Sequence, residues 1–282
     1  MKSILPASWL QDGRNYQIVF LGTFLMYGIW ALGWEAEIEK FGVLLGTCMI
    51  TQLIAAKIFG LPVTSVKSAI ITSLGMCILL QVNSLQTAAI AGFIAISSKF
   101  IFRINKKHFF NPANFGIIVC MLVTGDCWIS PGQWGSSGVL VFMVGALGAA
   151  VLFRVSRLDI SFFFLGTLFL LDYSRMIVYQ GWDWDFLWHK YSNGSLLLFT
   201  FFMITDPVST PSHPIARKIW AMGVAGLTFY LASFMQVHTA PVWALFIISP
   251  ATVIFDYLLK AKKFEWLPSV RNSTITSNTK TL

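Results

Sequence analysis

The sequence has 282 residues, of which 56% are hydrophobic and only 11% are charged, and its net charge is +8. An average soluble domain carries about 25% charged residues. This composition excludes an ordinary soluble domain and predicts an all-α polytopic membrane protein, whose basic residues mark the cytoplasmic side rather than a nucleic-acid surface. The four cysteines lack the spacing typical of a disulfide framework or a metal site. We expect no signal peptide, because the N-terminal residues contain no long apolar core and no cleavage site.

Apolar runs along the chain predict about ten transmembrane helices, because a crossing helix needs about 20 apolar residues. The runs lie at 16–34, 42–60, 65–82, 87–103, 111–125, 138–154, 159–180, 194–205, 215–235 and 240–258. Two of them, 111–125 and 194–205, are too short for a simple crossing and predict short or broken helices.

The connecting segments alternate in charge. KFIFRINKKH (99–108) and the tail segment KAKKFEW are rich in lysine and arginine, whereas GDCWISPGQWG and MQVHTAP contain neither. This alternation follows the positive-inside rule and predicts that both termini are cytoplasmic. Ten spans can divide into five plus five, with inverted halves as in many transporters. We expect residues 1–264 to form a single transmembrane domain and residues 265–282 to form a polar cytoplasmic tail.

Two polar, proline-containing segments lie beside the short spans on the predicted cytoplasmic side. They are HFFNPANFG (108–116) and ITDPVSTP (204–211). Proline disfavours the helical conformation of the residue before it. Backbone released from a helix inside a membrane must be buried in protein or line a cavity, so these segments are candidates for a functional site. Alternatively, they are ordinary punctuation at helix ends.

Acidic residues in or near the apolar spans need partners, because an unpaired charge is costly there. Spacing along the chain suggests local partners. The expected pairs are Asp172 with Arg175, Asp256 with Lys260, and Asp206 with Arg217, Asp206 having a cap on the helix near Pro214 as its alternative.

At these segments the sequence resembles a known family. ITDPVSTPSHPIAR is similar to the "TDPVT-SP" signature of a membrane protein shared by two redox pumps, and FFNPANFG resembles that family's "FNPA" segment. NGSLLLFTFFM and LFIISPATVIFDYLLK resemble its neighbouring segments. The family comprises the NqrB component of the sodium-pumping NADH:quinone reductase and the RnfD component of the Rnf complex. The resemblance covers about residues 65–260, and the short form is similar to proteins associated with enediyne gene clusters.

This resemblance implies an electron-transfer subunit in a bacterial plasma (inner) membrane, with other membrane or soluble subunits as partners. Relatives carry FMN on a threonine, but no threonine occurs between Gly125 and Gly138, which argues against covalent FMN. A non-covalent flavin (FMN or riboflavin) or a quinone-like carrier is then expected. The implied cofactor-binding residues are Asn111, Asn114, Asp206, Ser209, Thr210 and Arg217, and the implied structural residues are Pro112, Pro207 and Pro211.

Two other functions fit the same sequence features. Broken helices and a five-plus-five division are equally typical of a small-solute or ion transporter or channel. A scaffold subunit without redox chemistry would also use this architecture. The sequence contains no P-loop, no G-x-G-x-x-G and no G-x-S-x-G motif, so it predicts neither a nucleotide-binding enzyme nor a stand-alone hydrolase.

Overall fold

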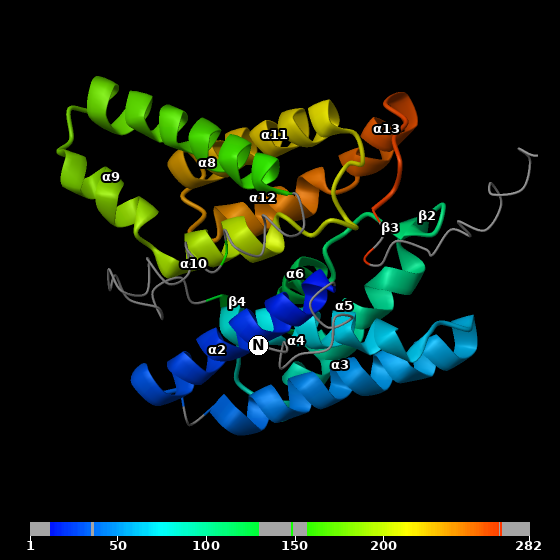
Figure 1. Ribbon diagram of the computed structural model, residues 1–282. Coiled ribbons are helices and arrows are strands. Elements are labelled where there is room, and N and C mark those ends of the chain that lie inside the picture. Colours follow the sequence, from blue (N-terminus) through cyan, green and yellow to red (C-terminus); the bar gives the residue numbers. More distant parts are fainter. Residues whose placement is uncertain (1–11, 35–36, 130–147, 149–156, 265, 267–282) are drawn as a thin grey trace, which may run out of the picture.

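A computed structural model describes residues 12–34, 37–129, 148, 157–264 and 266. The described part of the chain is mostly helical (Figure 1). Its first half contains α2 (Gly13–Ala31), α3 (Ile38–Phe59), η2 (Val63–Ser65), α4 (Val66–Leu79), β1 (Leu80–Val82), α5 (Leu85–Ile101), β2 (Arg103–Ile104), β3 (Lys107–His108), α6 (Pro112–Thr124) and β4 (Cys127–Ile129). Its second half contains α8 (Leu158–Tyr173), the π-helix η3 (Ser174–Tyr179), α9 (Trp184–Tyr191), α10 (Gly194–Leu198), the π-helix η4 (Phe199–Met203), α11 (Pro214–Ser233), α12 (Ala240–Ile248) and α13 (Ala251–Leu258).

Each predicted span apart from 138–154 contains a helix of the structure, and that span lies outside the described residues except for Gly148. Within the described residues, Ile38–Phe59 and Leu158–Tyr179 are long and apolar enough to cross a membrane. The pair α12–α13 gives a third candidate if it is one span. Several shorter apolar helices accompany them, including Gly194–Met203, so the number of ten crossings stays a prediction.

The bounds of several helices follow from local chemistry. Asn111 caps α6 with its side chain, and Pro112 occupies the first turn, where its missing N–H costs nothing. Gly125 ends the same helix in the left-handed conformation, which glycine adopts without strain. The predicted span 240–258 is not straight, because α12 and α13 are bent by 46° where Ser249 and Pro250 separate them.

The helices form two groups that repeat one packing order. In the first group, α3 packs against α4 and α5, and α5 packs against α6. In the second group, α8 packs against η4 and α11, and α11 packs against α12. The groups lie one above the other in Figure 1 and meet where α6 contacts α12. The core therefore runs through both groups, with Ile117, Phe164 and Val224 among its fully buried residues.

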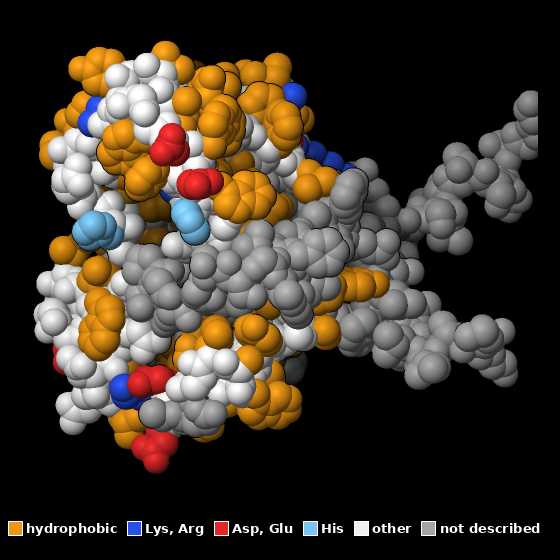
Figure 2. All heavy atoms as spheres, turned by 90° about the vertical axis from the view of Figure 1, so that its left-hand side faces the viewer, with side chains coloured by type: hydrophobic (Ala, Val, Ile, Leu, Met, Phe, Trp, Pro, Cys, Tyr) orange, Lys and Arg blue, Asp and Glu red, His pale blue; other side chains and the backbone are white. Residues whose placement is uncertain are grey.

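Basic side chains gather at one end of these groups, which we call the basic end. It contains Arg14, Lys67, Lys99, Lys107 and Arg217, each of which donates a hydrogen bond to another residue of this end. Figure 2 looks onto the opposite end, where acidic and histidine side chains are visible on the surface together with a few basic ones. The predicted separation of charge between the two ends is thus present in the described part of the chain.

Asp12 organises the start of the first helix at the basic end. It caps α2, and its carboxylate forms ion pairs with Arg14 and Lys67, each at 2.9 Å. Burial acts to raise the pKa of Asp12, but the hydrogen bonds from these two cations outweigh it and hold the pKa at about 2. The capping carboxylate therefore ties α2 to the start of α4.

We expect Asp12→Asn to lower stability by about 2 kcal/mol at pH 7. Because the pKa of Asp12 is lower in the folded protein than the ordinary 3.8, its contribution is present above about pH 4 and is lost as the pH falls towards 2. Thermal unfolding of both proteins in detergent at pH 7 and at pH 2–3 measures this. A difference between variant and parent that stays constant with pH would contradict the assignment.

Candidate functional site

The two polar segments predicted from the sequence meet at the basic end. The β2–β3 hairpin and the following His108–Asn111 stretch lie beside the loop 204–213. His108 Nε2 is 3.6 Å from Asp206 Oδ2, across nearly one hundred positions of sequence. We call the charged residues gathered here the basic-end cluster. It consists of Lys107, His108, Arg157, Asp159, Asp206, Arg217 and Asp256.

The two asparagines of the NPAN segment join three helix ends. Asn111 Oδ1 accepts the Asn114 N–H at 3.0 Å, and Asn111 Nδ2 donates to the Met203 carbonyl at 3.0 Å. Asn114 Nδ2 donates to the Val242 carbonyl at 2.8 Å. These bonds connect the start of α6 with the end of η4 and the first turn of α12. Asn111 thereby satisfies a carbonyl that the end of η4 leaves free, and Asn114 adds a second hydrogen bond between α6 and α12.

Asp206 organises the loop that follows the broken helix. Its Oδ1 accepts the Val208 N–H at 3.2 Å, which closes a local turn around Pro207. Burial acts to raise the pKa of Asp206, but the hydrogen bond and charge of His108, together with the Val208 N–H, hold it below the ordinary value. The carboxylate therefore stays ionised beside the histidine.

The predicted partner and cap for Asp206 are both wrong. Arg217 instead pairs with Asp159, with Nη2 at 2.8 Å and Nε at 2.9 Å from Oδ2, and it donates to the Ser212 carbonyl. His213, not Asp206, caps α11 by accepting the Ile215 N–H on Nδ1. Arg217 is fixed by the start of α8, so it secures the contact between α8 and α11.

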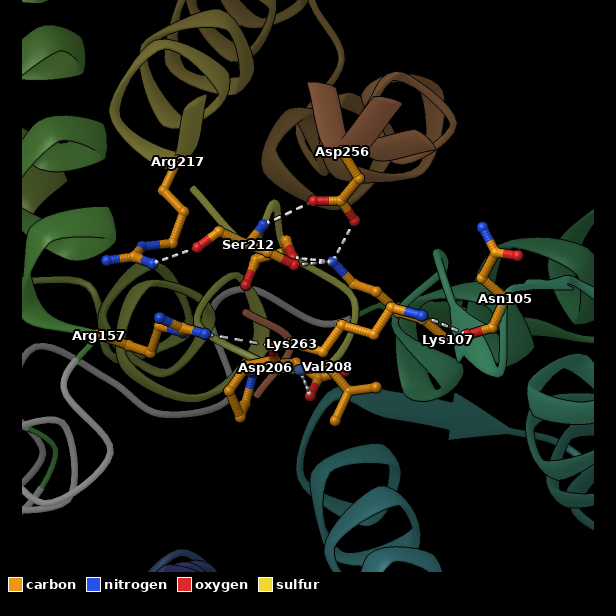
Figure 3. Close-up of polar contacts among 11 residues, drawn as sticks. Asn105, Lys107, Arg157, Asp206, Val208, Ser212, Arg217, Asp256 and Lys263 are labelled. Atoms are coloured by element: carbon orange, nitrogen blue, oxygen red, sulfur yellow. Dashed lines mark hydrogen bonds and ion pairs between the residues drawn. The ribbon is translucent and has the colours of Figure 1, made fainter. Parts of the chain in front are cut away.

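Asp256 also has a different partner from the one expected. It forms an ion pair with Lys107 on the hairpin and accepts the Ser212 N–H at 2.7 Å (Figure 3). Lys260 makes no ion pair among the described residues. Lys107 further donates to the Thr210 carbonyl at 2.6 Å. Burial lowers the pKa of Lys107, although the bond to Asp256 opposes this shift. These contacts hold the hairpin, the loop 204–213 and α13 together.

Arg157 completes the cluster at the start of α8. It is buried, its Nη2 lies 3.5 Å from the Pro207 carbonyl, and its guanidinium stands 5.3 Å from the centre of the Phe264 ring. Burial, assisted by the nearby charge of Arg217, lowers the pKa of Arg157 to about 10. In Figure 3 its side chain points towards the Asp206 turn.

A small cavity lies between the two helix groups beside this cluster. Its volume is about 80 Å³, and Trp266 forms part of its wall. Polar side chains reach it from both groups. They are Gln17, Ser68, Thr72, His108, Asn111 and Asp206. The cavity has room for a few water molecules, which occupy about 30 Å³ each in the liquid.

Most of the remaining residues named from the sequence lie near this cavity without lining it. Asn114 lies deeper, and Ser209 and Thr210 are buried in the loop. Pro207 and Pro211 are buried in the same loop, and Pro112 touches the cavity from the first turn of α6. Lys107, His108, Arg157 and Asp159 belong to the cluster but were not predicted as site residues. Their position in basic loops next to the two polar segments was the available signal.

A third predicted pair is also wrong. Asp172 does not pair with Arg175, but with Lys190 Nζ at 2.8 Å and with the Tyr191 hydroxyl at 2.9 Å. Arg175 stands over the Phe234 ring at 4.4 Å. The partners of Asp172 come from α9, a short helix that lay within a predicted loop. A second cavity, of about 180 Å³, lies at the end opposite to the basic end, and Lys190 and His238 are among the residues that line it.

The sequence was compared with models of known protein families. The model of the NQR2, RnfD, RnfE family matches residues 120–265, which is more than half of the chain. The chain belongs to the NQR2, RnfD, RnfE family. A comparison with curated proteins gave no match. The matched region contains Arg157, the loop 204–213 and Asp256, so most of the basic-end cluster lies within it. Family membership and the apolar helices together indicate an integral membrane subunit of an Rnf/Nqr-type electron transport complex.

Proposed function

We propose that this member of the NQR2, RnfD, RnfE family passes electrons between partner subunits through a non-covalent flavin or quinone-like carrier held at the basic-end cluster. Family membership carries the proposal. The position of the cluster supports it, because the ends of two broken helices and their polar loops converge there. Asn111, Asp206 and Arg217 offer fixed hydrogen-bonding groups around this point. The absence of threonine from 125–138 in the sequence argues against covalent FMN.

The cavity as the structure has it does not fit a flavin ring system. Its volume of about 80 Å³ is below the roughly 300 Å³ at which pockets for cofactor-sized ligands begin. Trp266 forms part of its wall, and the segment that carries Trp266 follows Lys263 and Phe264 across the basic end. Carrier binding at this point therefore requires Trp266 to move away.

We further propose that the chain crosses a bacterial inner membrane ten times with both termini in the cytoplasm. The gathering of basic side chains at one end supports this orientation. The repeated packing order, in which α3–α5–α6 corresponds to α8–α11–α12, supports two inverted five-helix halves. The division into a transmembrane domain (1–264) and a polar tail (265–282) belongs to the same proposal, and the tail lies outside the described residues except for Trp266.

A visible absorption spectrum of the detergent-purified protein, before and after acid precipitation, tests the carrier. Yellow colour released into the supernatant is expected for a non-covalent flavin, whereas colour retained in the pellet would show covalent attachment. A colourless extract calls for extraction and chromatography of quinones. If neither chromophore is found in a folded protein isolated with its partner subunits, the carrier proposal is wrong.

Substitutions of cavity residues test whether the carrier binds at this point. Asp206→Ala and Asn111→Ala should each reduce the bound carrier several-fold, because one removes the partner of His108 and the other releases the end of η4. Lys57→Gln is the matched control, since Lys57 is exposed at the end of α3 and away from the cavity. Unchanged carrier content in both cavity variants would move the carrier site elsewhere.

A solute or ion transporter is the second candidate function. Two cavities, one beside Asp206 and one beside Lys190 and His238, favour it together with the repeated packing order. Uptake of solute into proteoliposomes by a colourless protein would support this candidate. A scaffold subunit would show neither chromophore nor uptake and would still purify with its partners.

A further inference from the structure

A separate groove lies on the outer side of the basic-end cluster. It is lined by residues of the β2–β3 hairpin, of α13 and of the segment that follows α13. The hairpin and α13 lie on the right-hand side of Figure 1. Its volume is about 410 Å³, within the range of ligand-binding pockets. It shares Lys107 and Asp256 with the basic-end cluster but none of the residues that line the small cavity, and the inference drawn from it does not depend on the proposed redox function.

The groove carries uncompensated positive charge. Three lysines line it, Lys107, Lys260 and Lys263, against one carboxylate, Asp256. Lys107 neutralises Asp256 and is held by it. Lys260 is exposed and makes no ion pair within the described residues. Lys263 donates one hydrogen bond to the Asn105 carbonyl at 2.6 Å, as Figure 3 shows, which leaves its remaining N–H groups for a ligand. Two ammonium groups are therefore free to meet an anion.

The wall of the groove also contains a buried hydroxyl that lacks a partner. Thr252 is only 1% exposed, and its Oγ1 has no hydrogen-bond partner among the described residues. Leaving such a group unpaired costs about 1–3 kcal/mol, so a buried hydroxyl is normally satisfied by protein, water or ligand. Thr252 lines the groove but its Oγ1 is enclosed, so a ligand oxygen would reach this hydroxyl only after a small shift of the surrounding side chains.

The same helix presents a large apolar surface next to these polar groups. Tyr257 is 79% exposed, and Ile254 and Leu258 are similarly uncovered on α13. Ile104 on the hairpin adds to this surface from the other side of the groove. In a membrane protein exposed apolar residues of this kind face acyl chains, whereas neighbouring lysines reach towards the headgroups. Cationic and apolar side chains therefore lie close together at the groove, as binding of a phospholipid requires.

We propose that this groove binds an anionic phospholipid, with the headgroup phosphate between Lys260 and Lys263 and an acyl chain along Tyr257 and Leu258. Basic pockets between helices at the cytoplasmic surface bind lipid headgroups in this way. The bound lipid would join the hairpin to α13. It would therefore reinforce the contact that Lys107 and Asp256 make on the inner side of the groove.

Native mass spectrometry of the full chain with phosphatidylglycerol and with phosphatidylcholine tests the proposal. We expect selective binding of phosphatidylglycerol. Lys260→Gln/Lys263→Gln should weaken it roughly 10- to 30-fold, since each lysine near a membrane surface contributes about 1 kcal/mol. Lys57→Gln/Lys262→Gln is the matched control, because it removes two exposed charges from the same end without touching the groove. Equal loss in both double variants would show diffuse attraction and overturn the site.

Two further measurements test the role of Thr252 and identify whether the bound phosphate belongs to a lipid or to a soluble compound. Thr252→Val is expected to weaken phosphatidylglycerol binding several-fold while leaving the fold intact, because valine replaces the hydroxyl by a methyl group of similar size. Glycerol 3-phosphate should not compete at concentrations where the lipid is saturating. Competition by glycerol 3-phosphate would identify a soluble phosphate compound as the ligand. Equal binding of phosphatidylglycerol and phosphatidylcholine would exclude a headgroup-specific site. Either result would overturn the proposal.

Discussion

Asp256→Ala should be among the most destabilising single substitutions in this protein, lowering the free energy of unfolding by about 2–4 kcal/mol. The substitution leaves the largely buried Lys107 ammonium without its counter-charge and the Ser212 N–H without its acceptor. It also frees the β2–β3 hairpin from α13. Thermal unfolding in detergent, followed by tryptophan fluorescence, measures the loss.

Two comparison variants make this result specific. Lys260→Gln removes the partner that helical spacing predicts, and it should leave thermal unfolding in delipidated detergent nearly unchanged. Lys107→Met combined with Asp256→Leu removes both charges and should recover part of the stability lost in Asp256→Ala, because no unpaired ion remains. If Lys260→Gln were as damaging as Asp256→Ala, the ion pair assigned to Lys107 would be wrong.

The sequence predicted where helices break far better than it predicted which residues meet there. Asn111–Pro112 starts a helix, and Asp206–Pro207 follows the end of one, as the conformational limits of proline require. Capping by Asn111 is a local effect and depends on neighbours three residues away. Such features can be read from a short stretch of sequence because all the interacting atoms belong to that stretch.

Partners of the acidic residues could not be read in the same way. Asp172, Asp206 and Asp256 were each assigned a partner close in sequence, and each has a distant one instead. For Asp172 and Asp256 the assignment used a spacing of three or four positions, which only identifies residues that share a helix face. A buried carboxylate is satisfied by whichever cation the packing of other helices brings near it. That packing depends on the whole chain, so the partners follow from the tertiary structure alone.

Two elements were missed for different reasons. α9 is only eight residues long and lies in a tryptophan-rich segment, so its apolar content does not distinguish it from a loop. Pro250 indicates the bend between α12 and α13, but the prediction treated residues 240–258 as one straight span because the apolar run continues on both sides of Ser249–Pro250. Length and hydropathy identify spans, but a proline within a span interrupts the helix as effectively as one at its end.

Gly116→Val should destabilise the protein by about 3 kcal/mol through a different cause, the close approach of two helices. A Cβ atom at Gly116 would lie 2.5 Å from Ala95 Cβ, 3.0 Å from Ala95 Cα and 3.1 Å from the Ala91 carbonyl oxygen. Two of these are backbone atoms, so α5 and α6 would have to separate. Since α6 carries Asn111 and Asn114 at its start, their bonds to Met203 and Val242 should weaken as well.

Paired variants distinguish this contact from a general preference for glycine. Gly226→Ala, in α11, adds a Cβ with no atom within 4 Å, so it should be neutral or stabilise the protein by up to about 1 kcal/mol. Gly116→Ala should be destabilising, and adding Ala95→Gly should restore part of the loss because it removes the nearest atom. Thermal unfolding of the four proteins decides the matter. If Ala95→Gly gave no recovery, the close contact between α5 and α6 would not be the reason why residue 116 must be glycine.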